Sequence, residues 1–239
     1  MTDQLYMTMN DGHNIPVVGL GTWKSEPGDS TYNAVFDSIK AGYRHIDTAR
    51  AYDNESDVGR AINAADVPRE NLFITTKLWN KDQGYGSALE ACEKSLARLD
   101  CGYIDLYLIH WPLKDLRNDS WKAFIELQKR GLCRSIGVSN FTIDNLKELE
   151  EKYDVLPAIN QVEFHPYHYQ KELLEYCNSK SIIIQDSFIG KTEDATPRSP
   201  SKFTNSAPIL AFTNLDHSKI AHVYVVTFEQ KKVFGSSSP

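Results

Sequence analysis

The segment "GYRHIDTARAYDNE", Gly42–Glu55, combines the composition of a buried strand with a carboxylate inside that strand. Tyr43 to Ala49 predicts the strand, Asp47 lies near its carboxyl end, and Tyr52 follows five residues after Asp47. A carboxylate is costly to bury unless a positive partner and hydrogen bonds compensate for its lost hydration. The segment therefore predicts a core strand that ends in a functional carboxylate, with a phenol just beyond it.

Strand-like and helical segments alternate on both sides of this segment. The predicted strands are Val17–Thr22, His45–Ala49, Leu72–Leu78, Ile104–His110, Ser135–Val138, Ala158–Phe164 and Ile182–Ser187. The predicted helices are Ser30–Ala41, Glu55–Ala65, Ser87–Leu99, Ser120–Arg130, Ile143–Lys152 and Gln170–Ser179. This alternation predicts a parallel sheet covered by helices, and right-handed crossovers can close such a sheet into a TIM-type (β/α)8 barrel. The length of 239 residues is close to the roughly 250 typical of that fold.

Both ends of the chain modify the barrel pattern. Asn10-Asp11-Gly12 lies between two short apolar runs and predicts an N-terminal β-hairpin. We expect residues 1–190 to form this hairpin and seven βα units, and residues 191–239 to form a divergent C-terminal segment rich in Ser, Thr and Pro. His222–Phe228 is a possible last strand, because seven strands leave two unpaired edges. The eighth strand and the C-terminal loop are thus expected to be altered or incomplete.

Two helix starts carry capping residues. Asp119 or Ser120 can cap the helix that ends before Gly131, and Thr142 can cap the helix that follows. These positions predict where the fourth and fifth helices begin.

Composition narrows the functional classes. The formal net charge of -6 argues against nucleic acid as a partner, and no apolar run approaches the 18 residues of a membrane span. The four cysteines show no metal-binding spacing, so we expect reduced thiols, no metal site and a cytoplasmic protein. We expect a monomer, although an unclosed barrel edge would favour self-association.

Polar residues interrupt the carboxyl ends of five successive predicted strands. These residues are Asp47, Lys77, His110, the pair Ser139-Asn140 and the pair Asn160-Gln161. Alone, such an aspartate or lysine is usually a solvated rim residue, and such a histidine is more often part of a core. Together they face one rim of a barrel, where active sites lie. A metal site built from His45, His110 and Glu163 is a weaker alternative.

The residue types at this rim suit proton donation to a carbonyl oxygen. A free tyrosine has a pKa near 10, and a lysine ammonium nearby favours the phenolate and lowers that value. Asp47 would hold Lys77, Lys77 would tune Tyr52, and His110 would add a hydrogen bond to the polarised oxygen.

Five ordered motifs resemble the aldo-keto reductase family. They are "GYRHIDTARAYDNESDVG", "ITTKLWN", "YIDLYLIHWP", "SIGVSNF" and "INQVEFHPY", and the similarity runs from about Thr8 to Lys180. The resemblance implies a (β/α)8 barrel that reduces small-molecule aldehydes or ketones with NADPH, without a glycine-rich dinucleotide-binding turn. It also implies the catalytic set Asp47, Tyr52, Lys77 and His110, with Tyr52 as the proton donor.

The same resemblance implies the surroundings of the catalytic set. The implied cofactor-binding residues are Gly21, Thr22, Trp23, Asp47, Ser139, Asn140, Gln161 and Ser187, with Asn160 beside them. The implied substrate pocket consists of Trp23, Trp79, His110 and Trp111, although these tryptophans could also be packed for volume.

The pattern departs from the family after Lys180. Asp186 replaces the tyrosine that stacks on the nicotinamide ring, and Phe188 replaces a proline. The later Ile-Pro-Lys-Ser stretch, which grips the 2′-phosphate of NADPH, is not found. These departures favour an alternative in which the chain is a non-catalytic barrel with impaired cofactor binding and a regulatory or interaction role.

Overall fold

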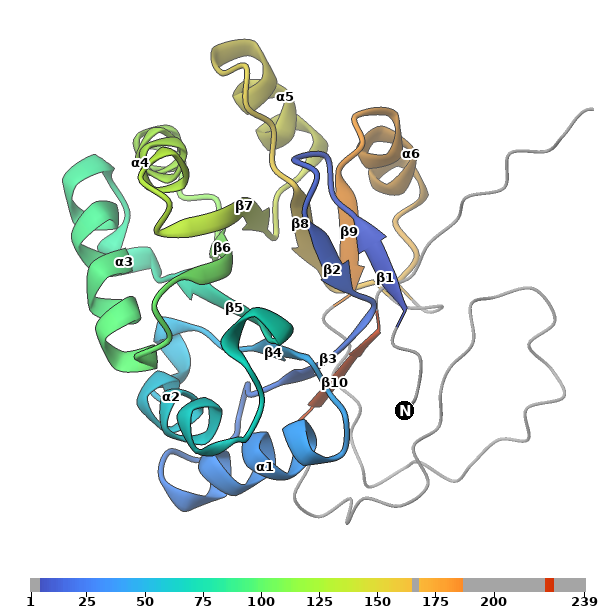
Figure 1. Ribbon diagram of the computed structural model, residues 1–239. Helices are drawn as coiled ribbons and strands as arrows, with labels where there is room; N and C mark the ends of the chain where they lie inside the picture. The colour runs from blue at the N-terminus through green and yellow to red at the C-terminus, as the bar shows by residue number, and fades with distance from the viewer. Residues whose placement is uncertain (1–4, 165–167, 187–221, 226–239) are drawn as a thin grey trace, which may run out of the picture.

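The computed structural model describes residues 5–164, 168–186 and 222–225 (Figure 1). The chain opens with a hairpin in which β1 (Tyr6–Thr8) pairs antiparallel with β2 (Asn14–Pro16). Gly12 has a φ of 87° in the connecting turn, a left-handed conformation that glycine adopts without strain. The hairpin predicted from Asn10-Asp11-Gly12 is therefore confirmed.

A curved parallel sheet forms the centre of the molecule, with helices around its outer face (Figure 1). Its seven parallel strands are β3 (Val18–Gly21), β4 (His45–Asp47), β5 (Phe73–Leu78), β6 (Ile104–Ile109), β7 (Cys133–Ser139), β8 (Ile159–Val162) and β9 (Ile183–Asp186). Each strand pairs with the next in chain order, as right-handed βα crossovers produce. The predicted TIM-type architecture with an incomplete last part is thus confirmed.

The remaining strand of the sheet runs in the other direction. β10 (His222–Val225) pairs antiparallel with β3, and its register places His222 opposite Gly21. β10 and β9 are the two ends of the hydrogen-bonded order among the described residues. A complete (β/α)8 barrel has a parallel strand at this place. The predicted last strand is present over 222–225, and residues 226–228 of that prediction lie outside the described residues.

The helices begin within one residue of their predicted starts, except that the third begins two residues earlier and the fourth three residues earlier than predicted. They are α1 (Asp29–Lys40), α2 (Glu55–Ala64), α3 (Tyr85–Leu99), α4 (Arg117–Lys129), α5 (Ile143–Lys152) and α6 (Lys171–Ser179). Thr142 caps α5 as predicted, in a reciprocal capping box with Asn145. The predicted cap of α4 is wrong. Ser120 lies inside the helix, where its hydroxyl donates to the carbonyl of Leu116 and accepts from the amide of Gly84.

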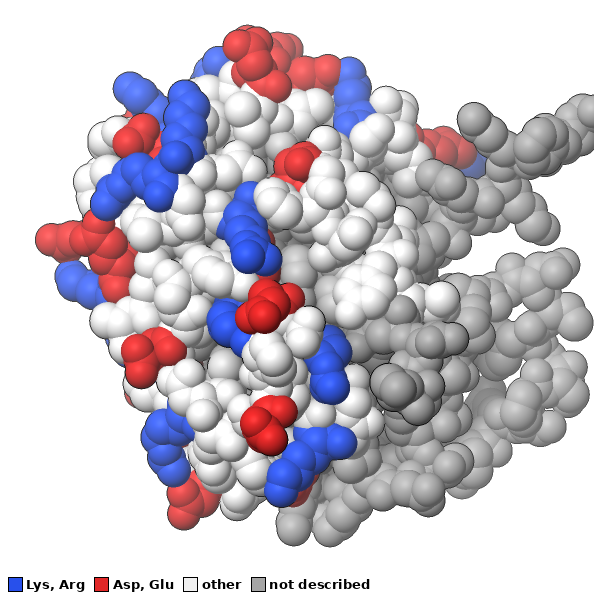
Figure 2. All heavy atoms as spheres, viewed as in Figure 1, with Lys and Arg blue, Asp and Glu red and all other residues white. Residues whose placement is uncertain are grey.

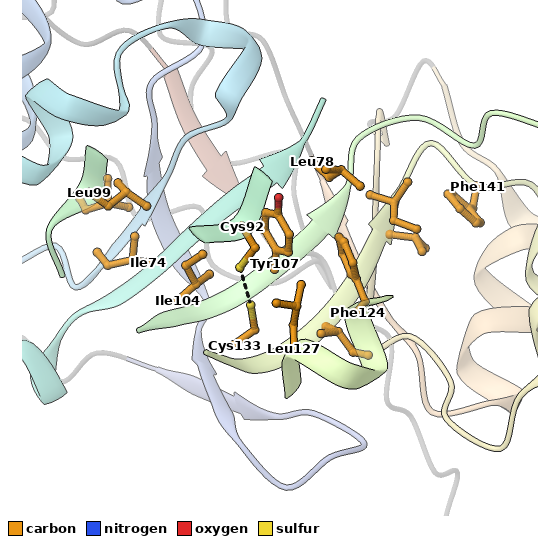
Figure 3. Close-up of a cluster of buried hydrophobic side chains, with 14 of the residues drawn as sticks. Ile74, Leu78, Cys92, Leu99, Ile104, Tyr107, Phe124, Leu127, Cys133 and Phe141 are labelled. Carbon is orange, nitrogen blue, oxygen red and sulfur yellow. Dashed lines mark hydrogen bonds between the residues drawn. The ribbon is translucent and has the colours of Figure 1, made fainter. Parts of the chain in front are cut away.

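Two apolar layers hold this fold. The outer layer packs helices against the sheet, and it includes Tyr107 and Phe124, whose rings stack with centroids 4.5 Å apart (Figure 3). The inner layer fills the barrel and consists of Phe73, Leu106, Leu108, Ala158, Ile159 and Ile183, closed from the hairpin side by Met9 and Ile15. The lower part of the barrel is therefore solid, and polar inward residues are left at the carboxyl ends of the strands.

The cysteines form no disulfide among the described residues, and side chains of both charges are mixed on one face of the molecule. The four cysteines are buried and free, with the Sγ atoms of Cys92 and Cys133 3.5 Å apart (Figure 3). Acidic and basic side chains alternate over the face shown in Figure 2, and neither sign gathers into one extended patch there. No helix in the described part of the chain is long and apolar enough to cross a membrane.

Candidate active site

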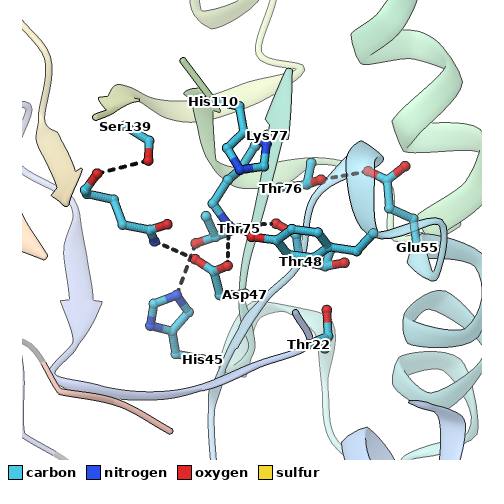
Figure 4. Close-up of polar contacts among 12 residues, drawn as sticks. Thr22, His45, Asp47, Thr48, Glu55, Thr75, Thr76, Lys77, His110 and Ser139 are labelled. Atoms are coloured by element: carbon cyan, nitrogen blue, oxygen red, sulfur yellow. Dashed lines mark hydrogen bonds and ion pairs between the residues drawn. The ribbon is translucent and has the colours of Figure 1, made fainter. Parts of the chain in front are cut away.

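The centre of the site is a buried ion pair between neighbouring strands. Asp47 ends β4 and Lys77 lies near the end of β5, and both side chains are completely buried. The Lys77 Nζ donates to Oδ1 of Asp47 and, over 3.0 Å, to the carbonyl oxygen of Thr48 (Figure 4). Its third neighbour is the hydroxyl of Tyr52, 3.5 Å away. One ammonium therefore joins the carboxylate to the phenol, as the sequence predicts.

A short helical turn brings Tyr52 to this ammonium. Tyr52 ends the 3₁₀ turn η1 (Arg50–Tyr52), and the next residue, Asp53, has a left-handed φ of 57° that ends the turn. Asn54 then fixes the loop, because its Oδ1 accepts from the hydroxyls of Thr48 at 2.8 Å and Thr22 at 3.3 Å. Its amide nitrogen donates to the Thr22 carbonyl at 2.9 Å. The position of the phenol is thus set by the loop that follows β4.

His110 packs against the phenol from the end of β6. Its ring is nearly perpendicular to that of Tyr52, with centroids 5.8 Å apart, and lies 5.3 Å from the ring of Trp79. Its Nδ1 is buried and has no hydrogen-bond partner among the described residues. The imidazole is therefore held by packing against the rings of Tyr52 and Trp79.

Burial and charge set the protonation states of Lys77 and His110. Burial acts to lower the pKa of Lys77, but the charge of Asp47, followed by Tyr52, outweighs it, so that the pKa lies above its usual value. Burial, assisted by the charge of Lys77, lowers the pKa of His110 to about 3. At neutral pH the lysine is a cation and the histidine is neutral, so the site holds one fixed positive charge beside a neutral hydrogen-bonding ring.

Hydroxyl and amide side chains form the opposite side of the site. Ser139 Oγ donates to the carbonyl of Gln161 over 2.8 Å, and Asn140, with a left-handed φ of 62°, donates its backbone N–H to the same oxygen over 2.9 Å. The Asn140 side chain donates to the carbonyl of His110 over 3.0 Å. Asn160 is not part of this wall. Its side-chain oxygen accepts from the backbone N–H of Phe141, and its side-chain nitrogen donates to the backbone carbonyl of Phe141. The wall therefore consists of Ser139, Asn140 and Gln161.

These groups surround a cavity of about 400 Å³. Its lining consists of Trp23, Ala51, Tyr52, Trp79, His110, Trp111, Ser139, Asn140, Gln161 and Glu163. All four residues of the predicted substrate pocket are in this lining. Trp111 is 46% exposed and forms part of the mouth, so it is not packed merely to fill the core. Ala51 and Glu163 are additions to the predicted set.

Three of the predicted cofactor-binding residues that the structure describes, Gly21, Thr22 and Asp47, are not part of this lining. Gly21 is paired with Asp47 in the sheet, and Thr22 is buried with its hydroxyl on Asn54. Ser187 lies outside the described residues. Asp186 is buried, and its Oδ1 accepts the backbone N–H of Phe164 over 2.9 Å. This carboxylate therefore links the ends of β8 and β9.

No group of three His, Cys, Asp or Glu side chains able to hold a metal ion occurs among the described residues. His45, His110 and Glu163 consequently do not form the metal site considered as an alternative. His45 instead accepts or donates a 3.0 Å hydrogen bond with the hydroxyl of Thr75, below the ion pair (Figure 4).

Known proteins resemble this chain along most of its length. It is 50% identical over 177 residues to the glyoxal reductase of Bacillus subtilis, covering 74% of this chain and 64% of that protein. It is 46% identical over 175 residues to the methylglyoxal reductase of Salmonella typhimurium, covering 72% of this chain and 62% of that protein. The chain thus spans less than two thirds of either relative.

Solved structures and a family model also match this chain. The crystal structure of a Bombyx mori aldo-keto reductase in complex with NADP matches with a TM-score of 0.75 and 36% identity, covering 84% of this chain and 72% of that one. The model of the Aldo/keto reductase family matches residues 17–187. With its parallel barrel strands and the Asp47–Lys77–Tyr52 contacts at their carboxyl ends, the chain belongs to the aldo/keto reductase family.

Proposed function

We propose that this chain reduces small aldehydes or ketones to alcohols with NADPH, and that Tyr52 donates the proton. The main support for this proposal is the position of the Lys77 ammonium between the carboxylate of Asp47 and the hydroxyl of Tyr52. The glyoxal and methylglyoxal reductases among its relatives support small carbonyl compounds as the substrate class.

The catalytic tetrad, Asp47, Tyr52, Lys77 and His110, has the electrostatics that proton donation requires. As a carbonyl oxygen gains negative charge, a proton donor must release its proton and then remain stable as an anion. The cation of Lys77 favours the phenolate of Tyr52, and Asp47 keeps that cation in place. Neutral His110, at the edge of the same cavity, can hydrogen-bond the substrate oxygen without adding a second buried positive charge.

The cavity fits a flat ring that carries an amide. Ser139, Asn140 and Gln161 present neutral hydroxyl and amide groups on one side, and Trp23 forms part of the lining. Asp186, the carboxylate that replaces a stacking tyrosine, is absent from that lining and is held by the Phe164 backbone. NADPH, when bound, supplies the hydride that the carbonyl carbon receives. Ser139, Asn140 and Gln161 would hold its carboxamide, and Asp47 lies behind them.

Tryptophans would orient the substrate on the other side of the cavity. Trp23, Trp79 and Trp111 give it apolar walls, and the ring of His110 lies 5.3 Å from that of Trp79. Apolar walls exclude water and hold the carbonyl carbon near the amide wall, so that the oxygen faces Tyr52 and His110. A volume of about 400 Å³ suits a small substrate together with one ring of the cofactor.

A second candidate is a non-catalytic barrel that binds NADPH poorly. The antiparallel pairing of β10 with β3 and the carboxylate of Asp186 at the end of β9 favour it. It differs from the first candidate in one measurable property, which is affinity for the cofactor.

Tryptophan fluorescence measures that property directly. Trp23, Trp79 and Trp111 line the cavity, so NADPH binding should quench their emission. We expect saturable quenching at micromolar NADPH, followed by consumption of NADPH when glyoxal is added. Trp111→Phe should reduce the quenching amplitude, because it removes one reporter at the mouth. No saturation at millimolar NADPH would reject the reductase proposal in favour of the non-catalytic barrel.

A further inference from the structure

Asp47 has a second hydrogen-bond donor on the far side of the barrel. While its Oδ1 holds Lys77, its Oδ2 accepts from Nε2 of Gln161 over 2.7 Å. Gln161 is 3% exposed and Asp47 is fully buried. Their strands, β8 and β4, lie opposite one another, because β5, β6 and β7 separate them in the sheet order. The hydrogen bond therefore crosses the inside of the barrel and joins the amide wall to the ion pair.

Gln161 is itself fixed in place by the end of β7. Its backbone carbonyl oxygen accepts both from Ser139 Oγ at 2.8 Å and from the backbone N–H of Asn140 at 2.9 Å. Asn140 in turn holds the backbone of His110. The amide that reaches Asp47 thus comes from an anchored residue, and an anchored donor restricts the rotation of the carboxylate that it bonds.

Both oxygens of this carboxylate need donors. A buried acceptor left without a hydrogen-bond partner destabilises the folded chain, and more so if the acceptor is charged. Lys77 alone satisfies one oxygen and leaves the carboxylate free to turn about its χ2 angle. With Gln161 on the other oxygen, the carboxylate plane is fixed with one edge toward Lys77.

We propose that Gln161 is a positioning residue of the tetrad, which orients Asp47 so that Lys77 remains beside Tyr52. The inference rests on the proposed function for its catalytic meaning. It goes beyond the role that the family resemblance gives to Gln161, which is contact with the nicotinamide. The new claim is that Gln161 and Asp47 are energetically coupled before any cofactor binds.

The neighbouring strand supplies a matched control. Gln185 of β9 is paired in register with Gln161, and it is fully buried. Neither polar atom of its side chain has a hydrogen-bond partner in the described part of the chain. Gln161→Met and Gln185→Met therefore make the same chemical change on adjacent strands, but only the first removes a donor from Asp47.

The test is a double-mutant cycle on the cofactor-free chain, read as stability in urea. We expect Gln161→Met to lower the ratio of folded to unfolded protein about tenfold, as loss of a hydrogen bond to a charged group does. In an Asp47→Asn background the same substitution should cost clearly less. Gln185→Met should show the same effect in both backgrounds. If Gln161→Met does not fold, the shorter Gln161→Asn is used in the same cycle.

Turnover distinguishes positioning from cofactor contact. A positioning role predicts that Gln161→Met lowers kcat at saturating NADPH and glyoxal, whereas a carboxamide contact alone raises the NADPH dissociation constant and leaves kcat unchanged. Equal costs of Gln161→Met in the two backgrounds would overturn the inference, whether or not the chain is a reductase. A clear coupling in a chain without turnover would support the link and reject the proposed function instead.

Discussion

Lys77 and Asp47 form an ion pair in which neither side chain has any exposed surface. Such a pair is expensive to create, because both charges lose their hydration, and it is rarely retained for stability alone. Here the ammonium has a third contact, the hydroxyl of Tyr52 at 3.5 Å. The arrangement is explained if the charge acts on the phenol.

Lys77→Met should destabilise the chain by about 3–5 kcal/mol, because it leaves the Asp47 carboxylate buried without its cation. Adding Asp47→Asn should recover part of this loss, since the uncompensated charge is then removed. Urea unfolding of the two single variants and the double variant measures this. Losses that simply add would contradict the direct coupling of the two groups.

Stability should fall as the pH falls below 6.5, because two histidines resist protonation in the folded chain. Burial is the main reason why the pKa of His45 is lowered to about 4 and that of His110 to about 3. The unfolded chain takes up these protons near pH 6.5, whereas the folded chain does not. Between pH 7 and pH 5 each histidine should therefore cost about 2 kcal/mol of unfolding free energy.

Unfolding measured at both pH values tests this for the parent, His45→Gln and His110→Gln. Each variant should lose less stability than the parent over that interval. An unchanged loss in both variants would show that the histidines are not the groups responsible.

Asn54 should stabilise the loop that carries Tyr52. Asn54→Ala removes the acceptor of two buried hydroxyls and the donor to the Thr22 carbonyl, so we expect a loss of roughly 2–3 kcal/mol and a lower kcat. Asn63, whose amide bonds Asp100 on the surface, is the control, and Asn63→Ala should cost well under 1 kcal/mol. Equal effects of the two variants on stability and turnover would contradict this account of the loop.

Two helical glycines differ in the space around them. A Cβ on Gly59 of α2 would lie 2.4 Å from the backbone oxygen of Leu99, whereas a Cβ on Gly86 of α3 would meet nothing within 4 Å. Gly59→Ala should therefore cost about 1–3 kcal/mol by overpacking. Gly86→Ala should be neutral or stabilise by up to about 1 kcal/mol. Thermal melting distinguishes the two, and a melting temperature lowered equally by both would contradict the close packing of α2 against α3.

The barrel and the members of its site could be predicted from the sequence because local patterns encode them. Alternating strands and helices determine a parallel sheet, and the carboxyl ends of parallel strands meet at one rim. Asp47, Lys77 and His110 each end such a strand, so their convergence follows from the fold.

Other features depend on long-range partners and could not be predicted. The direction of β10 is decided by its pairing with β3, about 200 residues earlier in the chain. The contact of Gln161 with Asp47 joins positions 114 residues apart. Ser120 resembles a helix cap in the sequence, but its hydroxyl is used by Leu116 and Gly84. In each case a tertiary contact outweighs the local signal.

The most direct test of the proposed chemistry compares the parent chain with Tyr52→Phe at saturating NADPH and glyoxal. The variant keeps the ring beside His110 and Lys77 but lacks the hydroxyl that faces the ammonium. We predict an NADPH dissociation constant within about twofold of the parent and a kcat lower by at least a hundredfold, the scale of general acid catalysis. Reduction of glyoxal by the variant at the parental rate would contradict Tyr52 as the proton donor.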